Sequence, residues 1–177
     1  IMTKKIIIAG SGGEGIMLLG KILAETAMRE GKFVTWLPSY GAEVRGGTAH
    51  CMVVVSDQEI GSPYVEAADI LIVMNAPSLV KFKSRLNPKG TVFVNSSLAS
   101  HDFVGKLHVI AHPFTQKAVE LGNIRVANMV ALGNFVKITG IVKEETVTKV
   151  VADIAPPDKK HLIEINRKAL LEGARLS

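Results

Sequence analysis

Three glycines near the start of the chain have the spacing of a phosphate-binding loop. Gly10, Gly12 and Gly15 form the pattern G-x-G-x-x-G between a short apolar run and a segment with helical periodicity. In that context the glycines allow a tight turn and close approach of a phosphate, and the free N–H groups at the helix N-terminus attract an anion. Three interpretations remain open: a dinucleotide site, a site for another anion or cofactor, or a tight turn without a ligand.

Two features weaken the dinucleotide interpretation. A dinucleotide-binding fold requires an acidic residue at the end of its second strand to hold the ribose hydroxyls, but the corresponding residues here read TWLPSY. Within the loop itself, the carboxylate of Glu14 would repel a pyrophosphate. A stand-alone NAD(P)-binding oxidoreductase is therefore kept only as an alternative.

A second candidate segment, residues 38–51, reads PSYGAEVRGGTAHC and places an acid and a base between glycines. Arg45 carries a planar guanidinium suited to a carboxylate or a phosphate, and the two glycines after it allow close approach of another backbone. Tyrosine and arginine, here Tyr40 and Arg45, are also enriched at the energetic centres of interfaces. The segment is either a structural loop with an internal Glu43–Arg45 pair, or a surface that contacts a ligand or a partner.

The other reactive side chains do not form a catalytic or metal-binding set. Cys51 lies in a continuous apolar run, where a small core residue is expected rather than a nucleophile. His108 and His112 share one face of an expected strand, but no carboxylate or thiol accompanies them at metal-ligand spacing. We predict no catalytic residue and no metal ligand in this chain.

Alternating strands and helices position the two candidate segments. Strands are expected at residues 4–9, 33–37, 50–56, 68–75, 91–95 and 106–112, and C-terminal helices at about 114–121, 125–139, 144–154 and 160–174. This alternation predicts an α/β, Rossmann-like fold with a doubly wound, mainly parallel sheet. Ligands of such folds bind beyond the carboxyl ends of the strands, where we expect the loops at 10–15 and 38–48.

The chain is expected to form a single domain over residues 2–177. An α/β core covers about residues 2–113, and a helical part covers about 114–177 and packs against the sheet. No internal repeat or linker divides the sequence. The length of 177 residues is sufficient for one hydrophobic core.

Composition argues against several classes of partner and compartment. The net charge is +5, but no basic run exceeds two residues, so nucleic-acid binding is not expected. No stretch of about twenty uncharged apolar residues is present, so no membrane span is expected. The single cysteine is compatible with a reducing cytoplasm, and one cysteine cannot hold a four-cysteine iron–sulfur cluster.

Four stretches of the sequence resemble the gamma subunit of 2-oxoacid:ferredoxin oxidoreductases. They are GSGGEGIMLLGKILAETA, PSYGAEVRGGTAHCMVVVS, EAADILIVMNAPSL and NMVALGNFVKITG, which together follow the family over essentially the whole chain. The most specific part is YGAEVRGGTA. The residues that match the glycine loop and the second block of the family are Gly10, Gly12, Gly13, Glu14 and Gly15, then Tyr40, Gly41, Glu43, Arg45, Gly46, Gly47 and Thr48.

The resemblance implies a non-catalytic subunit of an enzyme that oxidatively decarboxylates a 2-oxoacid. Such enzymes use thiamine diphosphate with magnesium, transfer the acyl group to CoA, and pass electrons through iron–sulfur clusters to ferredoxin. These groups reside on other subunits (alpha, beta and delta-like), so none is expected on this chain alone. The resemblance assigns both matched blocks to the CoA side of the active site or to the subunit interface. It favours 2-oxoglutarate or branched-chain substrates over pyruvate, with 2-oxoglutarate preferred.

Two other possibilities remain at this point. One is the stand-alone NAD(P)-binding oxidoreductase that the glycine loop suggests. The other is an interaction module of a different complex, since the second segment has the composition of a contact surface. A homodimer is also left open for the isolated chain.

Overall fold

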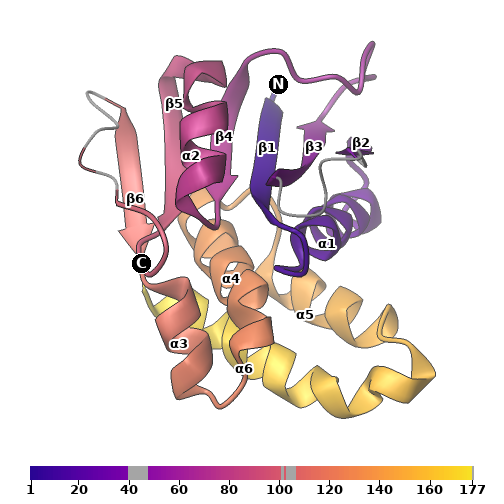
Figure 1. Ribbon diagram of the computed structural model, residues 1–177. Coiled ribbons are helices and arrows are strands. Elements are labelled where there is room, and N and C mark those ends of the chain that lie inside the picture. The colour runs from indigo at the N-terminus through magenta and orange to yellow at the C-terminus, as the bar shows by residue number, and fades with distance from the viewer. Residues whose placement is uncertain (40–47, 101, 103–106, 177) are drawn as a thin grey trace.

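The computed structural model describes residues 1–39, 48–100, 102 and 107–176. Its centre is a six-stranded sheet in the order β2-β3-β1-β4-β5-β6 (Figure 1). The elements in chain order are β1 (Thr3–Ser11), α1 (Ile16–Arg29), β2 (Phe33–Ser39), β3 (Thr48–Ser56), β4 (Ala68–Val73), α2 (Ala76–Phe82), η2 (Lys83–Arg85), β5 (Leu86–Asn95), β6 (His108–His112), α3 (Phe114–Glu120), η3 (Ile124–Val126), α4 (Ala127–Thr139), α5 (Glu144–Asp153), η4 (Pro157–Leu162) and α6 (Ile163–Arg175). The predicted α/β class and the helical C-terminal part are confirmed.

The sheet is mixed, with one antiparallel strand among mainly parallel ones. β1, β4, β5 and β6 are parallel neighbours, whereas β3 runs antiparallel to both β1 and β2. The reason lies in the connections, because a parallel neighbour requires a crossover of a dozen or more residues. Only residues 40–47 join β2 to β3, and that length allows only an antiparallel return.

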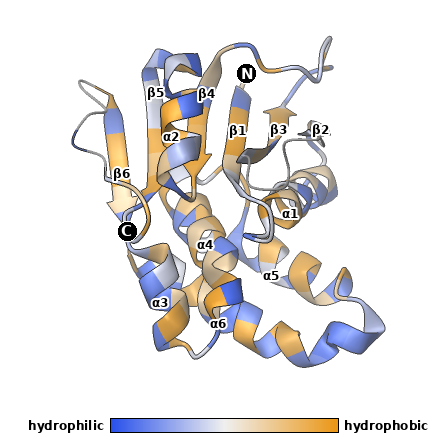
Figure 2. Cartoon of the chain, viewed as in Figure 1, coloured by the Kyte–Doolittle hydropathy of each residue, from blue (hydrophilic) through white to orange (hydrophobic). Residues whose placement is uncertain are grey.

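Alternation along the strands builds a separate core on each face of the sheet. On β1, Ile6 and Ile8 face one core, and Ile7 and Ala9 face the other; all four are fully buried. Apolar residues at consecutive positions are expected for a sheet that is covered on both faces. Figure 2 shows this as strands that are hydrophobic along most of their length.

The two faces are covered unequally. One face of the sheet, which we call the helical face, packs against five helices in one large core. These helices are α1, α3, α4, α5 and α6. The opposite face is covered by α2, through Leu79 and Phe82, and by the segment before β4, through Val65. Helices on both faces confirm the doubly wound arrangement.

α4 is the central helix of the C-terminal part. Every residue from Ala127 to Val136 is buried, as expected for a helix that is enclosed by other elements. Its closest neighbour is α6, which it approaches through two glycines. A β-carbon on Gly133 would collide with the carbonyl oxygen of Leu170, and one on Gly173 would collide with that of Val130. The two backbones are therefore in direct contact at this crossing.

Residues 87–90 read NPKG, a pattern typical of a turn, but the structure places no turn there. These residues lie within β5, which begins at Leu86. Pro88 is exposed beside an irregularity in the β4–β5 register between Ala68 and Ile70. Proline is tolerated in a sheet where the ladder is interrupted, so the proline and glycine that suggested a turn instead mark a distorted stretch of strand.

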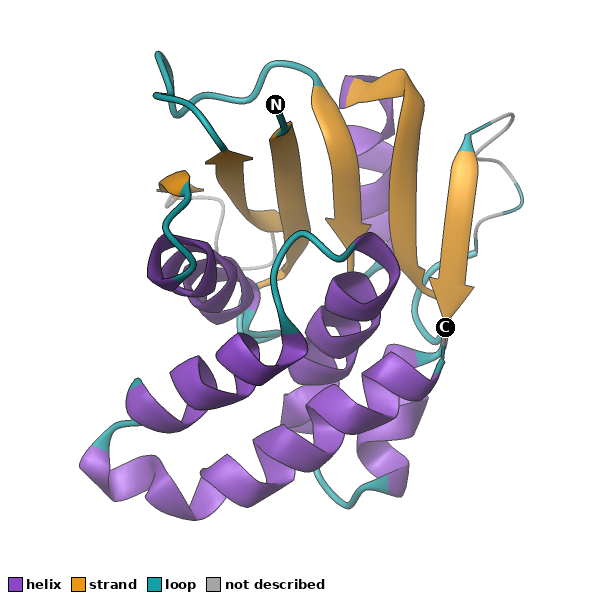
Figure 3. Ribbon diagram, turned by 180° about the vertical axis from the view of Figure 1, so that it is seen from behind, coloured by secondary structure: helices purple, strands orange, loops and turns teal. Residues whose placement is uncertain are grey.

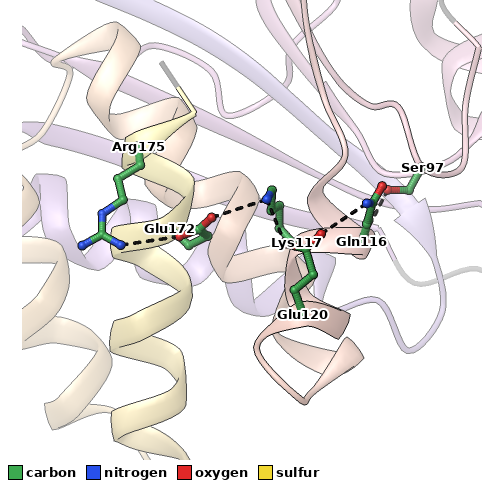
Figure 4. A network of polar contacts seen from close by, with 6 residues as sticks. All are labelled: Ser97, Gln116, Lys117, Glu120, Glu172 and Arg175. Atoms are coloured by element: carbon green, nitrogen blue, oxygen red, sulfur yellow. Dashed lines mark hydrogen bonds and ion pairs between the residues drawn. The ribbon is translucent and has the colours of Figure 1, made fainter.

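A chain of polar contacts ties α3 to its neighbours (Figure 4). The Lys117 ammonium lies 2.8 Å from a Glu120 carboxylate oxygen and 3.8 Å from one of Glu172 on α6. The backbone N–H of Gln116 donates to the Ser97 hydroxyl at 3.1 Å. These contacts hold α3 between α6 and the turn that follows β5.

Candidate functional site

The glycine loop and the described ends of the second candidate segment lie at the carboxyl edge of the parallel strands. Ser11, at the end of β1, pairs with Thr48 at the start of β3, and Ser39, at the end of β2, pairs with His50. The two ends of the second segment therefore stand beside the glycine loop. Thr48 is the only matched residue of the second block within the described part of the chain. The other predicted site residues of that block lie outside it, namely Tyr40, Gly41, Glu43, Arg45, Gly46 and Gly47.

The glycines of the loop serve internal packing. Gly13 and Gly15 have positive φ angles of 89° and 72°, which residues with side chains rarely adopt. The Asn128 amide also donates to the Gly15 carbonyl at 3.2 Å and occupies the space that a β-carbon would need. At Gly10 a β-carbon would lie 2.6 Å from a Glu14 carboxylate oxygen. The tight-turn interpretation explains this spacing without a phosphate.

The carboxylate of Glu14 folds back onto the loop that would bind a phosphate in a dinucleotide fold. Its carboxylate accepts a hydrogen bond from the Ser11 backbone N–H at 2.5 Å and another from the Asn75 amide at 3.1 Å. The same amide donates to the Ser11 hydroxyl at 2.7 Å. A phosphate would have to displace this carboxylate and would then meet its negative charge, so the geometry opposes NAD(P) binding here.

Asn75 joins the loop to the next strand end. Its side-chain oxygen accepts from the Ser78 N–H at 3.0 Å and so caps α2, as its position before Pro77 predicts. Its amide reaches back to the glycine loop. A single asparagine therefore connects the carboxyl ends of β1 and β4, which a capping pattern alone does not reveal.

Two hollows flank the glycine loop, and both are lined by Gly12 and Gly13. The β4-side hollow has a volume of about 300 Å³, and the β2-side hollow has a volume of about 400 Å³. Residues that line only the first include Met74, Leu98, Thr115, Ile124 and Arg125, and residues that line only the second include Ser11, Gly15, Met17, Leu18, Ser39 and Ala49.

The β4-side hollow is lined by a positively charged side chain, Arg125, that the sequence patterns do not indicate. Arg125 is exposed, and no described residue pairs with its guanidinium. The fully buried Asn95 donates to the Met74 carbonyl at 3.0 Å and to the Thr115 hydroxyl at 2.8 Å, and both of these residues line the hollow. Arg125 lies within the single-turn helix η3, in a segment without a motif, so only the fold brings it to the hollow beside the glycine loop.

Large apolar side chains are exposed around both hollows. Leu18, Leu98 and Ile124 retain 44%, 47% and 59% of their accessible surface. They come from α1, the turn after β5 and η3, and they line the hollows on either side of the same loop. Apolar side chains gathered around a polar loop are typical of an interaction surface.

The cysteine and the nearby histidine are not poised for catalysis. Burial raises the pKa of the Cys51 thiol to about 12, so the reactive thiolate does not form near neutral pH. Burial, together with the charges of Lys81 and Arg85, lowers the pKa of His50. Within the described ranges no cluster of metal-ligating side chains occurs. The one cysteine of the chain is inaccessible, so these residues do not fit an iron–sulfur cluster.

The family comparison agrees with this arrangement. The model of the pyruvate ferredoxin/flavodoxin oxidoreductase family matches residues 5–176. The chain belongs to this family. As the resemblance of the sequence blocks predicts, its relatives in the pyruvate ferredoxin/flavodoxin oxidoreductase family include subunits of 2-oxoacid oxidoreductases.

Three family members illustrate the likeness. The ketoisovalerate oxidoreductase subunit VorA of Methanothermobacter marburgensis is 37% identical over 172 residues, covering 96% of this chain but only 36% of that subunit. The 2-oxoglutarate synthase subunit KorC of the same organism is 33% identical over 98% of this chain and 100% of that one. The crystal structure of a keto/oxoacid ferredoxin oxidoreductase gamma subunit from Geobacter sulfurreducens matches with a TM-score of 0.85 and 31% identity, over 98% of this chain and 97% of that one. The chain therefore has the gamma-type fold of the family.

Proposed function

We propose that the chain is the gamma subunit of a multisubunit 2-oxoacid:ferredoxin oxidoreductase. In the proposed reaction a 2-oxoacid, CoA and two oxidised ferredoxins give an acyl-CoA, carbon dioxide, a proton and two reduced ferredoxins. Thiamine diphosphate with magnesium and the iron–sulfur clusters would belong to the alpha, beta and delta-like partner subunits, in a cytoplasmic complex. Family membership supports this role.

The observation that carries the proposal is the composition of the carboxyl edge. A glycine loop closed by its own glutamate lies between two hollows, and exposed apolar side chains border both. Such an edge has the means to bind a partner surface, but it lacks an acid–base pair or a nucleophile among the described residues. This combination supports contact with another subunit rather than chemistry on this chain.

We propose further that this edge borders the path of CoA. CoA carries phosphates, and an exposed arginine without a partner suits a phosphate. Arg125 meets this condition beside the β4-side hollow, and the adjacent second segment carries Arg45. The two arginines would supply positive charge to CoA or to a carboxylate of the partner, and the hollows would receive the apolar side chains of the partner.

The preferred substrate of the proposed complex is 2-oxoglutarate. A relative that covers 98% of this chain and is matched over its own full length is a 2-oxoglutarate synthase subunit. Ketoisovalerate is the second candidate, because the VorA relative has the higher identity. Ferredoxin reduction with 2-oxoglutarate, ketoisovalerate and pyruvate would rank the three substrates.

Affinity capture of the full chain from a native extract tests the proposal. The expected result is co-purification of subunits that contain thiamine diphosphate and iron–sulfur clusters, together with CoA-dependent ferredoxin reduction. Capture of partners without these groups would support an interaction module of another complex. Isothermal titration of the chain with NADH and NADPH tests the remaining alternative, and micromolar binding would favour a dinucleotide-dependent enzyme.

A further inference from the structure

A further hollow lies at the opposite end of the sheet from the candidate site. Its volume is about 670 Å³, and its lining comes from β1, β4, β5, β6 and the C-terminal end of α4. We call it the amino-end groove, because it opens at the amino ends of the parallel strands. Figure 3 shows that the helices cover the lower part of this face and leave the upper part of β4, β5 and β6 free.

The floor of the groove is apolar and preformed. Ile70, Phe93 and Ile110 come from three neighbouring strands, and Ile138 and Ile141 close one side. Ile138 retains 38% of its surface, just after the buried stretch of α4 ends at Val136. Gly90 keeps the floor close to the neighbouring strand, since a β-carbon there would lie 2.9 Å from the Asp69 carbonyl oxygen. An apolar floor of this size suits the body of a small organic molecule.

The rim of the groove carries two positive charges against one negative charge. Lys4 and Lys89 line it, and no described residue forms a hydrogen bond or an ion pair with either ammonium group. The acid of the groove, Asp69, is already satisfied, because its carboxylate accepts from the Lys5 backbone N–H and from the Asn87 amide, both at 2.9 Å. The lysines are thus available to an anion.

Two further groups complete the polar side of the groove. The Thr91 hydroxyl lies 3.2 Å from the Nδ1 atom of His108, which holds the imidazole at the rim.

The C-terminal end of α4 is a source of negative potential, but two of its last carbonyls are capped. Those of Phe135 and Val136 accept from the Thr139 hydroxyl at 2.8 Å and the Gly140 N–H at 2.9 Å.

We infer that the amino-end groove binds a small organic anion with an apolar body, such as an aryl or alkyl carboxylate. The apolar part packs against the floor and against the exposed Ile138, and the carboxylate pairs with Lys4 and Lys89. The groove lies about 20 Å from the glycine loop along β1. The inference therefore holds independently of the function of the carboxyl edge, and each can fail without the other.

A titration of the isotopically labelled full chain with 3-phenylpropionate, followed by amide chemical shifts, tests this inference. The expected result is saturable shifts at Ile70, Thr91, Ile110 and Thr139. The uncharged analogue 3-phenylpropan-1-ol should bind several-fold more weakly, because it cannot pair with the lysines. Each of Lys4→Ala and Lys89→Ala should weaken binding of the carboxylate about threefold, as for an exposed ion pair.

Controls separate specific binding from nonspecific attraction. Lys149→Ala removes an exposed lysine of α5 that does not line the groove and should leave the affinity for the carboxylate unchanged. The double variant Lys4→Ala/Lys89→Ala should bind acid and alcohol equally well. The inference is overturned if the groove amides show no saturable shift, if wild type binds the alcohol as tightly as the acid, or if Lys149→Ala weakens binding as much as the rim variants.

Discussion

The carboxylate of Glu14 accepts a hydrogen bond from the backbone N–H of Ser11, three residues earlier, at 2.5 Å. This contact closes a loop whose glycine spacing is otherwise typical of phosphate binding. The Asn75 amide adds a second hydrogen bond to the same carboxylate. The loop is therefore a turn closed by its own side chain, and it lines two hollows. The residues around the loop, rather than its glycines, are available to contact a ligand or a partner.

Replacing Glu14 by alanine should destabilise the chain by about 1–2 kcal/mol, because the Ser11 N–H and the Asn75 amide lose their acceptor. Glu14→Gln is the matched control, since its side-chain oxygen still accepts from Ser11, and it should lose less. Urea unfolding of the three proteins measures the difference. Equal stability of wild type and Glu14→Ala would show that the carboxylate does not support the loop.

Gly133→Ala and Gly173→Ala should each destabilise the fold by about 3 kcal/mol or more, because the added methyl group collides with backbone at the α4–α6 crossing. Gly61→Ala is the same chemical change in open space and should shift the free energy of unfolding by less than about 0.5 kcal/mol. Thermal or urea unfolding gives the comparison. Similar losses at all three sites would contradict the close backbone contact.

Cys51 should be unreactive in the native chain. Burial raises the pKa of its thiol to about 12, and its side chain is fully buried. At mildly alkaline pH a disulfide reagent should therefore react only as fast as the protein unfolds, and it should react rapidly in denaturant. Quick stoichiometric labelling of the folded chain would contradict a purely structural role for this residue.

Stability should fall as the solution is acidified below neutrality. Desolvation lowers the pKa of His50 and of His112 in the folded state from the usual value of 6.5. The unfolded chain therefore takes up protons first, and the contribution is complete above pH 6.5 and is lost as the pH falls from there toward the folded pKa values. The acidic side chains with lowered pKa, such as Asp57 and Glu120, contribute only at lower pH.

Unfolding free energies measured from about pH 7.5 to about pH 5.5 test this slope. The double variant His50→Gln/His112→Gln should show a shallower slope than wild type over that range. His161→Gln, at an exposed histidine of η4, should keep the wild-type slope. A slope unchanged by the double substitution would show that other groups cause the pH dependence.

The sequence pattern predicts the architecture well where apolar runs are long. The positions of β1, β4 and the C-terminal helices follow from the hydrophobic periodicity alone, since buried strands and amphipathic helices have distinct spacings. The direction of β3 does not follow from its own residues, because apolar runs look alike in parallel and antiparallel strands. It depends on the short connection from β2. The expected doubly wound pattern did not take the length of this connection into account.

The candidate site is predicted less completely for a physical reason. Sequence motifs report residues that are close along the chain, and the glycine loop is such a case. Arg125 reaches the hollow beside the loop only through the packing of η3, and Asn95 contributes only through Met74 and Thr115, which line that hollow. Single asparagines and arginines have no periodic signal. The sequence indicates the repulsive effect of Glu14, whereas its hydrogen bond to Ser11 becomes evident only from the turn geometry.

In the assembled complex, Arg125→Ala and Arg45→Ala should each raise the KM for CoA with little change in kcat, since both are proposed to contribute charge to binding. Loss of a charge-assisted hydrogen bond corresponds to about 1.5–3 kcal/mol, or roughly tenfold to a hundredfold in KM. Arg175→Ala removes an exposed arginine of α6 and serves as the control. Unchanged CoA kinetics and assembly in both variants would remove these arginines from the account.

The most direct test of the central claim is assembly of carboxyl-edge variants with the catalytic subunits. Leu18→Glu and Ile124→Glu place a charge on exposed apolar side chains beside the two hollows, and Met28→Glu makes the same kind of change on α1, at a side chain that retains 55% of its surface and lines neither hollow. All three isolated chains should remain folded. Size-exclusion chromatography of the co-expressed complex should show that Met28→Glu assembles, whereas Leu18→Glu and Ile124→Glu do not. An activity assay should show 2-oxoacid-dependent ferredoxin reduction with Met28→Glu and none with the other two variants. Full assembly and activity of the two edge variants would contradict a docking role for the carboxyl edge.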